Sequence, residues 1–266
     1  MKGLAIGVYV PGNSIAHRLD PRAKLMITIA YIALVFMAKR AVGIATAVVY
    51  LALAFALSGI NARLILRGLR SLTMLIVMTS VFNLFFTRTG RELFSVWRIS
   101  VTDEGVYLAV YFALRLMFLV TGTTMLTLTT SPIALTNGME SLMNPLKKIR
   151  FPAHEIAMMM SIALRFIPVL MEETDKIMKA QASRGADFET GSLMRRAKAL
   201  TPLLAPLFIS VFRRAGDLAL AMEARCYQGG EGRTRMSELK FTALDYRAFA
   251  IMGLLILCSA AENLLA

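Results

Sequence analysis

Five apolar segments alternate with charged stretches along the chain. They cover residues 25–38, 41–60, 71–87, about 105–130 and, much later, 248–261. A helix that crosses a bilayer needs about 20 apolar residues, with a rise of about 1.5 Å for each. The second and fourth segments reach that length, and the other three are shorter. The pattern predicts an all-α polytopic membrane protein with about five transmembrane helices.

The long segment 131–247 has a different pattern. It alternates charged patches with apolar stretches that are too short to span a bilayer, at 156–170 and 199–212. Apolar runs of this length suit helices that pack on other helices or lie in the membrane interface. We therefore predict three regions: an N-terminal transmembrane region with about four spans (1–130), a cytoplasmic or interfacial helical domain (131–247) and a C-terminal transmembrane helix (248–266).

Helix breakers divide this middle region into three expected helices. Between residues 153 and 183 the only breaker is Pro168, which predicts one long helix with a single kink. A second long helix is expected over about 206–225. A shorter amphipathic helix is expected within 131–152, where a Ser-Pro pair marks its start and an Asn-Pro pair marks its end.

The composition is that of a membrane protein. Hydrophobic residues make up 57% of the 266 residues and the mean hydropathy is +0.61, whereas a soluble domain has roughly 45 to 50% apolar residues. Residues 1–24 lack the apolar run of a cleavable signal peptide, so we expect the first apolar segment to stay in the mature protein. Cys226 and Cys258 stand far apart and form no pattern typical of a disulfide framework or a zinc site.

The net charge of +13 raises the question of a nucleic-acid partner. The basic residues lie at the ends of apolar runs and along 131–247, which holds 17 of the 30 lysines and arginines. They form no basic patch interleaved with aromatic residues, which argues against nucleic acid. Because lysine and arginine accumulate on cytoplasmic loops, we expect the N terminus and residues 131–247 to lie in the cytoplasm. The bilayer is then a partner, and its anionic lipids can bind the basic loops.

Three basic residues lie inside an apolar run or in the short gap between the first two runs. Lys39 and Arg40 leave almost no loop between the first two runs, so we expect a tight hairpin whose basic side chains reach an interface. Arg115 lies about ten residues into the fourth run, where an ionisable group is costly and often functional. Since the other spans offer no acidic partner, we expect Arg115 to snorkel or to bind backbone carbonyls between helices.

An arginine between small residues ends both of the expected long helices. These sequences are Ala182, Ser183, Arg184 and Gly185 in the first, and Ala224, Arg225 and Cys226 in the second. The helix dipole favours arginine at a C terminus, and glycine is common just past the end, so one interpretation is capping. Small neighbours in both places also let another backbone approach closely, while the guanidinium offers a planar fork of five donors. In this second interpretation the two helix ends, here called arginine tips, are docking sites for a partner protein.

The sequence resembles the transmembrane T component of energy-coupling factor transporters, the vitamin and trace-metal importers of the ABC class. The resemblance covers nearly the whole chain and is carried by "HRLDPRAKL" at 17–25 and by "QASRGADFETGSLMRRAKALTPLLAPLFISVFRRAGDLALAMEARCYQGGEGRTR" at 181–235. It implies a cytoplasmic coupling domain of long crossed helices. It also implies that Arg184 and Arg225 end two coupling helices, each inserting into a groove on one of two cytoplasmic ATPase subunits, identical or different. A small membrane protein that captures substrate, the S component, is the third expected partner.

The chemistry that the sequence offers agrees with a scaffold. A phosphate-binding Walker A loop needs a Gly-Lys pair, and the chain contains none, so ATP hydrolysis is assigned to partner subunits. The sequence "HEIAM" at 154–158 begins like a zinc-binding HExxH motif, but Met158 occupies the second ligand position. We therefore expect no catalytic residues, no metal site and no cofactor.

Together with these observations, the resemblance implies the scaffold subunit of an importer for a vitamin or another micronutrient in the cell membrane of a prokaryote. The alternatives are a stand-alone secondary carrier and an intramembrane enzyme. The sequence shows no inverted repeat of the kind many carriers have, and it shows no catalytic constellation.

Overall fold

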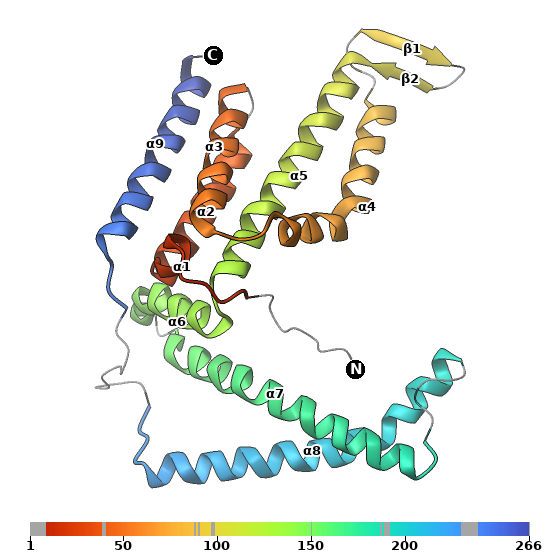
Figure 1. The fold of residues 1–266 in the computed structure, drawn as a ribbon, viewed down its shortest axis with the longest axis vertical. Coiled ribbons are helices and arrows are strands. Elements are labelled where there is room, and N and C mark those ends of the chain that lie inside the picture. Colours follow the sequence, from red (N-terminus) through yellow and green to blue (C-terminus); the bar gives the residue numbers. More distant parts are fainter. Residues whose placement is uncertain are drawn as a thin grey trace. The chain divides into compact units, whose positions relative to one another are not determined.

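The fold is all-α and polytopic, as predicted (Figure 1). The computed structural model describes residues 9–38, 41–87, 89, 91–96, 99–149, 151–186, 188, 192–229 and 239–265. In chain order the elements are α1 (Ile15–Arg18), α2 (Pro21–Met37), α3 (Ala41–Ser58), α4 (Ala62–Phe86), β1 (Glu92–Val96), β2 (Ile99–Thr102), α5 (Asp103–Thr129), α6 (Pro132–Met143), the 3-10 helix η1 (Asn144–Ile149), α7 (Ala153–Ser183), α8 (Leu193–Ala224) and α9 (Ala243–Leu265).

The chain divides into two compact units. The membrane unit consists of Met1–Leu142 and Glu238–Ala266, and the second unit is Met143–Ser237. The chain therefore leaves the membrane unit once and returns to it once. The predicted functional region 131–247 is wider than the second unit at both ends, and its cytoplasmic location stays a prediction.

Several helices extend beyond the apolar runs that predicted them. By length and hydropathy, α4, α5, α7 and residues Ala243–Glu262 of α9 are long enough to cross a membrane, and Val42–Ser58 of α3 forms a shorter apolar helix. The last apolar run, residues 248–261, becomes a helix of 23 residues because α9 begins at Ala243. The length of α7 also meets this criterion, so length and composition alone do not separate α7 from the spans.

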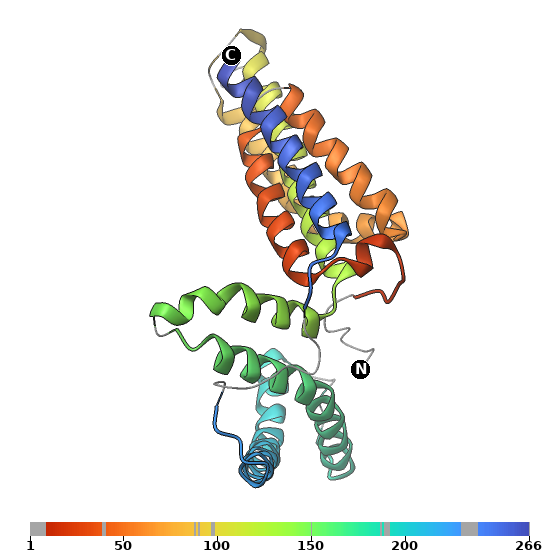
Figure 2. The same ribbon diagram turned by 90° about the vertical axis from the view of Figure 1, so that its left-hand side faces the viewer.

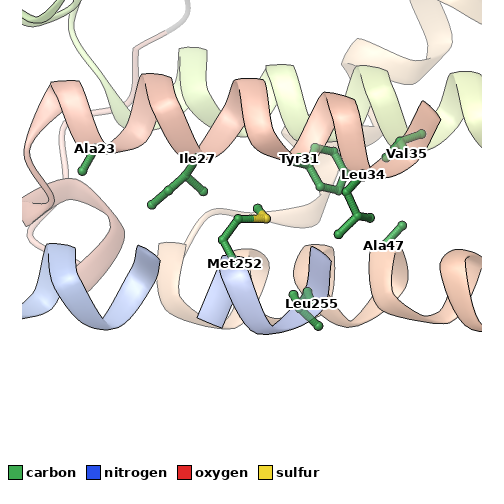
Figure 3. Packing of buried hydrophobic residues seen from close by; sticks show 8 residues of the cluster. All are labelled: Ala23, Ile27, Tyr31, Leu34, Val35, Ala47, Met252 and Leu255. Carbon is green, nitrogen blue, oxygen red and sulfur yellow. The ribbon is translucent and has the colours of Figure 1, made fainter. Parts of the chain in front are cut away.

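The core of the membrane unit lies between α2, α3 and α9 (Figure 3). Figure 2 shows α9 running alongside α2 and α3, although α9 follows them by about two hundred residues in the sequence. The buried cluster consists of Ala23, Ile27, Tyr31, Leu34, Val35, Ala47, Met252 and Leu255.

Tyr31 is the largest fully buried side chain of this core. Its ring stacks on Tyr50 of α3 with 4.4 Å between centroids, and its hydroxyl donates to the Phe118 carbonyl of α5 at 3.1 Å. The ring fills the space beside Gly122 of α5, where a Cβ atom would lie 2.3 Å from the nearest ring carbon. Glycine at this position lets α5 approach α2.

Arg115 of α5 binds the C-terminal end of α2. Its guanidinium donates to the carbonyls of Phe36 at 2.8 Å and of Val35 at 3.4 Å, and the Tyr111 hydroxyl donates to the Ala38 carbonyl at 2.6 Å. The last carbonyls of a helix have no partner within the helix. Of the two roles expected for Arg115, the structure therefore shows the binding of carbonyls between helices.

Glu262 near the end of α9 caps the start of α3. Its two carboxylate oxygens accept hydrogen bonds from the backbone amides of Val42 at 3.2 Å and Gly43 at 2.9 Å. A carboxylate at a helix N terminus is stabilised by the free amides and by the helix dipole. Lys39 and Arg40, which were predicted to reach an interface just before α3, lie outside the described residues.

The second unit contains one long helix that agrees with its prediction and one that differs. Helix α7 covers Ala153–Ser183 with Pro168 inside it, as predicted. The prediction for α8 was wrong at its start, because the helix begins at Leu193 and continues through Pro202 and Pro206. The basic stretch before Pro202 forms the first part of this helix. The β1–β2 hairpin between α4 and α5 was not predicted either.

Candidate functional site: two arginine-ended helices

Helices α7 and α8 pack against each other in opposite directions. Glu173 of α7 accepts a hydrogen bond and ion pair from Arg214 of α8 at 3.4 Å. Earlier residues of α7, Met158 and Ile162, line a pocket of about 440 Å³ together with the end of α8, including Arg225. The start of α7 therefore lies beside the end of α8, and the two helices run antiparallel.

The first arginine tip is closed by a Schellman motif. Arg184 follows the last residue of α7, and Gly185 adopts a left-handed conformation with a φ of +89°. The Gly185 amide donates to the Ala182 carbonyl at 2.9 Å, and the Ala186 amide donates to the Gln181 carbonyl at 3.0 Å. This pair of bonds, five-to-two and six-to-one, satisfies carbonyls that the helix end would otherwise leave free.

The second tip repeats the same backbone geometry. Arg225 follows the last residue of α8, and Cys226 takes the left-handed position with a φ of +55°. The Cys226 amide donates to the Glu223 carbonyl at 2.8 Å, and the Tyr227 amide donates to the Met222 carbonyl at 3.0 Å. Cys226 is the only residue other than glycine with a positive φ among the described residues. A side chain there costs energy that glycine avoids.

The two motifs align residue by residue. Arg184 and Arg225 both occupy the C-cap position, and Gly185 matches Cys226 at the left-handed position. Ser183 matches Ala224 as the last helical residue. Both arginines are exposed. The predicted site residues therefore form two equivalent groups.

The antiparallel packing keeps these groups apart. Arg225 shares a pocket with Met158, which precedes Arg184 by 26 positions along the chain. At about 1.5 Å of rise per residue, that interval corresponds to about 39 Å along α7. The crossing pair Glu173 and Arg214 lies between the tips, because each of these residues precedes its own tip arginine by eleven positions. The arrangement offers two separate cationic contacts.

Each tip exposes a guanidinium at the end of a helix. A guanidinium at a C-cap is supported by the helix dipole, and it carries a planar fork of five donors. Among the residues that the structure describes, no group of three or more histidine, cysteine or acidic side chains is placed to hold a metal ion. His154 and Met158 of the "HEIAM" sequence lie in the first turns of α7.

Sequence reasoning found the arginines but missed the ion pair between their helices. Glu173 belongs to an acidic cluster just past Pro168, and the sequence alone does not indicate that it pairs with Arg214 of the next helix. From the sequence, Cys226 was not matched to Gly185. An alignment of the two segments on their arginines would have shown this match.

Comparisons with known proteins point to a single family. The family model described as cobalt transport protein, CbiQ, matches residues 12–236. Several curated relatives are named energy-coupling factor transporter transmembrane protein EcfT. The relative from Thermosediminibacter oceani is 54% identical over 255 residues, which is 96% of each chain. The relative from Clostridium kluyveri is 50% identical over 97% of this chain and 96% of its own. That from Bacillus subtilis is 44% identical over 97% of both chains.

Proposed function

Because the chain belongs to the cobalt transport protein family, CbiQ, and is a transmembrane component of energy-coupling factor transporters, we propose that it transmits movement between subunits. Two cytoplasmic ATPase subunits bind the arginine tips, and their ATP-driven closure moves α7 and α8. The movement reorients a small membrane S component, which releases a vitamin or another micronutrient into the cell. The N terminus and the second unit lie in the cytoplasm of a prokaryotic cell.

The observation that carries this proposal is the equivalence of the two tips. The same backbone motif presents Arg184 and Arg225 in the same position, although their flanking residues differ. Capping alone does not require arginine at both C-caps, because the Schellman bonds are made by backbone atoms. Two equal tips are what two equal or similar partner subunits would need.

The separation of the tips supports two docking events. Met158 lies beside Arg225, and about 39 Å of α7 separates Met158 from Arg184. One small protein domain therefore cannot contact both tips through a single groove. The pair Glu173 and Arg214 fixes the crossing of α7 and α8 between them. Inward movement of two bound subunits would then act on the helices as on crossed levers.

The sequence supports the assignment of ATP hydrolysis to partner subunits. The chain lacks the Gly-Lys pair of a Walker A loop, so the ATPase subunits would hydrolyse ATP. Substrate recognition would belong to the S component.

Charge reversal at the tips tests the proposal. Arg184→Glu, Arg225→Glu and the double variant are expressed with the ATPase subunits and an S component. We expect each single variant to weaken recovery of the ATPases after purification, and the double variant to abolish both recovery and ATP-driven uptake. Removing a charged contact from a desolvated interface typically costs about 2 to 5 kcal/mol.

Arg213→Glu is the matched control, because Arg213 is an exposed arginine on α8 at a distance from the tip. It should insert, assemble and transport as the wild type does. Full uptake by the double variant would overturn the proposal. ATP-independent transport by this chain alone in liposomes would favour a secondary carrier instead.

A further inference from the structure

Arg22 contacts the chain next to both of its connections between the two units. The chain leaves the membrane unit after Leu142 and re-enters it at Glu238. Arg22, in the first turn of α2, hydrogen-bonds Ser141 on the outgoing segment and Leu239 on the returning segment. Both contacts lie within the membrane unit, next to the points where its boundary falls.

The guanidinium of Arg22 uses separate donors and its flat face for these contacts. Its Nη1 donates to the Ser141 hydroxyl at 3.2 Å, and its Nη2 donates to the Leu239 carbonyl. The guanidinium carbon also lies 4.5 Å from the centroid of the Phe241 ring, two positions beyond Leu239. A planar fork with five donors can make these contacts together, whereas the ammonium group of lysine cannot match the fork or stack in the same way.

Asp20 holds this guanidinium in place from the other side. Its Oδ1 accepts hydrogen bonds from the Arg22 amide at 2.8 Å and from Arg22 Nε at 3.2 Å, and its Oδ2 accepts from Nη2 at 3.2 Å. The Asp20 side chain is itself buried, and its backbone amide donates to the Asp245 carboxylate of α9 at 2.8 Å. Arg22 is therefore fixed to the start of α2, and the start of α2 is fixed to α9.

We propose that Arg22 is a positioning residue that clamps both connecting segments of the second unit to the start of α2. Displacement of the second unit then reaches α2 and α9 directly instead of being absorbed by bending of the connections. Without the clamp, the tips could still bind their partners, but the movement would be lost before it reached the membrane unit. This transmission rests on the proposed function, whereas the clamp itself does not.

The two cysteines allow the clamp to be tested on the full chain. Cys226 lies in the second unit and Cys258 in α9 of the membrane unit, both are exposed free thiols, and the chain has no others. Spin labels on both cysteines, in chains reconstituted in lipid nanodiscs, report the distribution of distances between the units by pulsed electron paramagnetic resonance. We expect the distribution for Arg22→Gln to be clearly broader than that for the wild type.

Arg18→Gln is the matched control, because Arg18 is an exposed arginine of α1 four positions earlier. It removes the same charge and should leave the distribution unchanged. Arg22→Lys should broaden it partly, since one ammonium group replaces the fork. Ser141→Ala, which removes only the Nη1 contact, serves as a milder variant if Arg22→Gln does not fold. Distributions of equal width for the wild type, Ser141→Ala and Arg22→Lys would overturn the clamp.

A second measurement tests transmission in the assembled transporter. We expect Arg22→Gln to retain ATPase binding and ATP hydrolysis but to lower uptake per ATP hydrolysed by at least about fivefold, the lower end of the usual range for coupling between sites. A broader distance distribution with unchanged uptake per ATP would overturn the transmission role. The resonance measurement needs no partner, and the tip variants leave Arg22 intact, so the clamp and the proposed function can fail separately.

Discussion

The Asp245 carboxylate accepts a hydrogen bond from the backbone amide of Asp20, 225 positions earlier in the chain, at 2.8 Å. Its other oxygen accepts from the amide and the hydroxyl of Thr242, both at 2.7 Å. Asp245 is fully buried. One carboxylate thus caps the start of its own helix α9 and ties it to the start of α2.

Replacement of Asp245 should therefore destabilise the membrane unit. Asp245→Ala leaves the buried amide of Asp20 and the partly buried amide of Thr242 without this acceptor, and the loss at a buried amide costs about 1 to 3 kcal/mol. We expect a clear fall in the temperature at which the purified chain loses its monodisperse peak in size-exclusion chromatography. Asp217→Ala, at an exposed acidic position of α8, is the control and should behave as the wild type. Equal thermal stability of the two variants would contradict the bridging role.

Two glycines in transmembrane helices should respond oppositely to alanine. Gly122→Ala places a Cβ atom 2.3 Å from the Tyr31 ring, and such overpacking typically costs about 1 to 3 kcal/mol. Gly253→Ala on α9 meets nothing within 4 Å and removes a glycine from a helix interior, which favours the helix by about 1 kcal/mol. The measurement is the thermal stability of both variants in the same detergent. A loss of stability in Gly253→Ala equal to that in Gly122→Ala would contradict the packing account.

The equivalent positions of the two tips predict a reciprocal pair of effects. Cys226→Gly removes a side chain from a left-handed residue and should stabilise the end of α8 by about 1 kcal/mol. Gly185→Ala adds a side chain at the matching position and should destabilise the end of α7 by a similar amount. Amide hydrogen exchange of residues 218–227 and 177–186 measures the two ends separately. Slower exchange after the first change and faster exchange after the second is the expected result, and the reverse pattern would refute the equivalence.

The contacts of Arg115 predict that its loss weakens the attachment of α5 to α2. Arg115→Gln removes the donors to the carbonyls of Val35 and Phe36. The expected loss of stability is about 1 kcal/mol, because hydrogen bonds to carbonyls at the end of α2 are lost. Thermal unfolding in detergent measures it, with Arg67→Gln on the exposed face of α4 as the control. If uptake failed while stability was unchanged, Arg115 would have a role beyond binding carbonyls.

Local signals in the sequence were sufficient for most helices. The apolar runs predicted the transmembrane helices, and the absence of breakers other than Pro168 predicted the bounds of α7. The start of α8 was misplaced because Pro202 and Pro206 argue for a break, yet both lie within the helix. The hairpin between α4 and α5 was missed because the apolar runs used to predict the helices do not indicate short strands.

The sequence by itself determined the membrane class, the long helices and the arginine at each helix end, because hydropathy and helix capping depend on residues close together in the chain. The tertiary structure alone decided which distant groups meet. It joined Asp20 to Asp245, seated Tyr31 against Gly122 and brought Ser141 and Leu239 to Arg22. Such contacts depend on how helices far apart in sequence pack, and the sequence around an arginine or aspartate does not indicate which distant group it will contact.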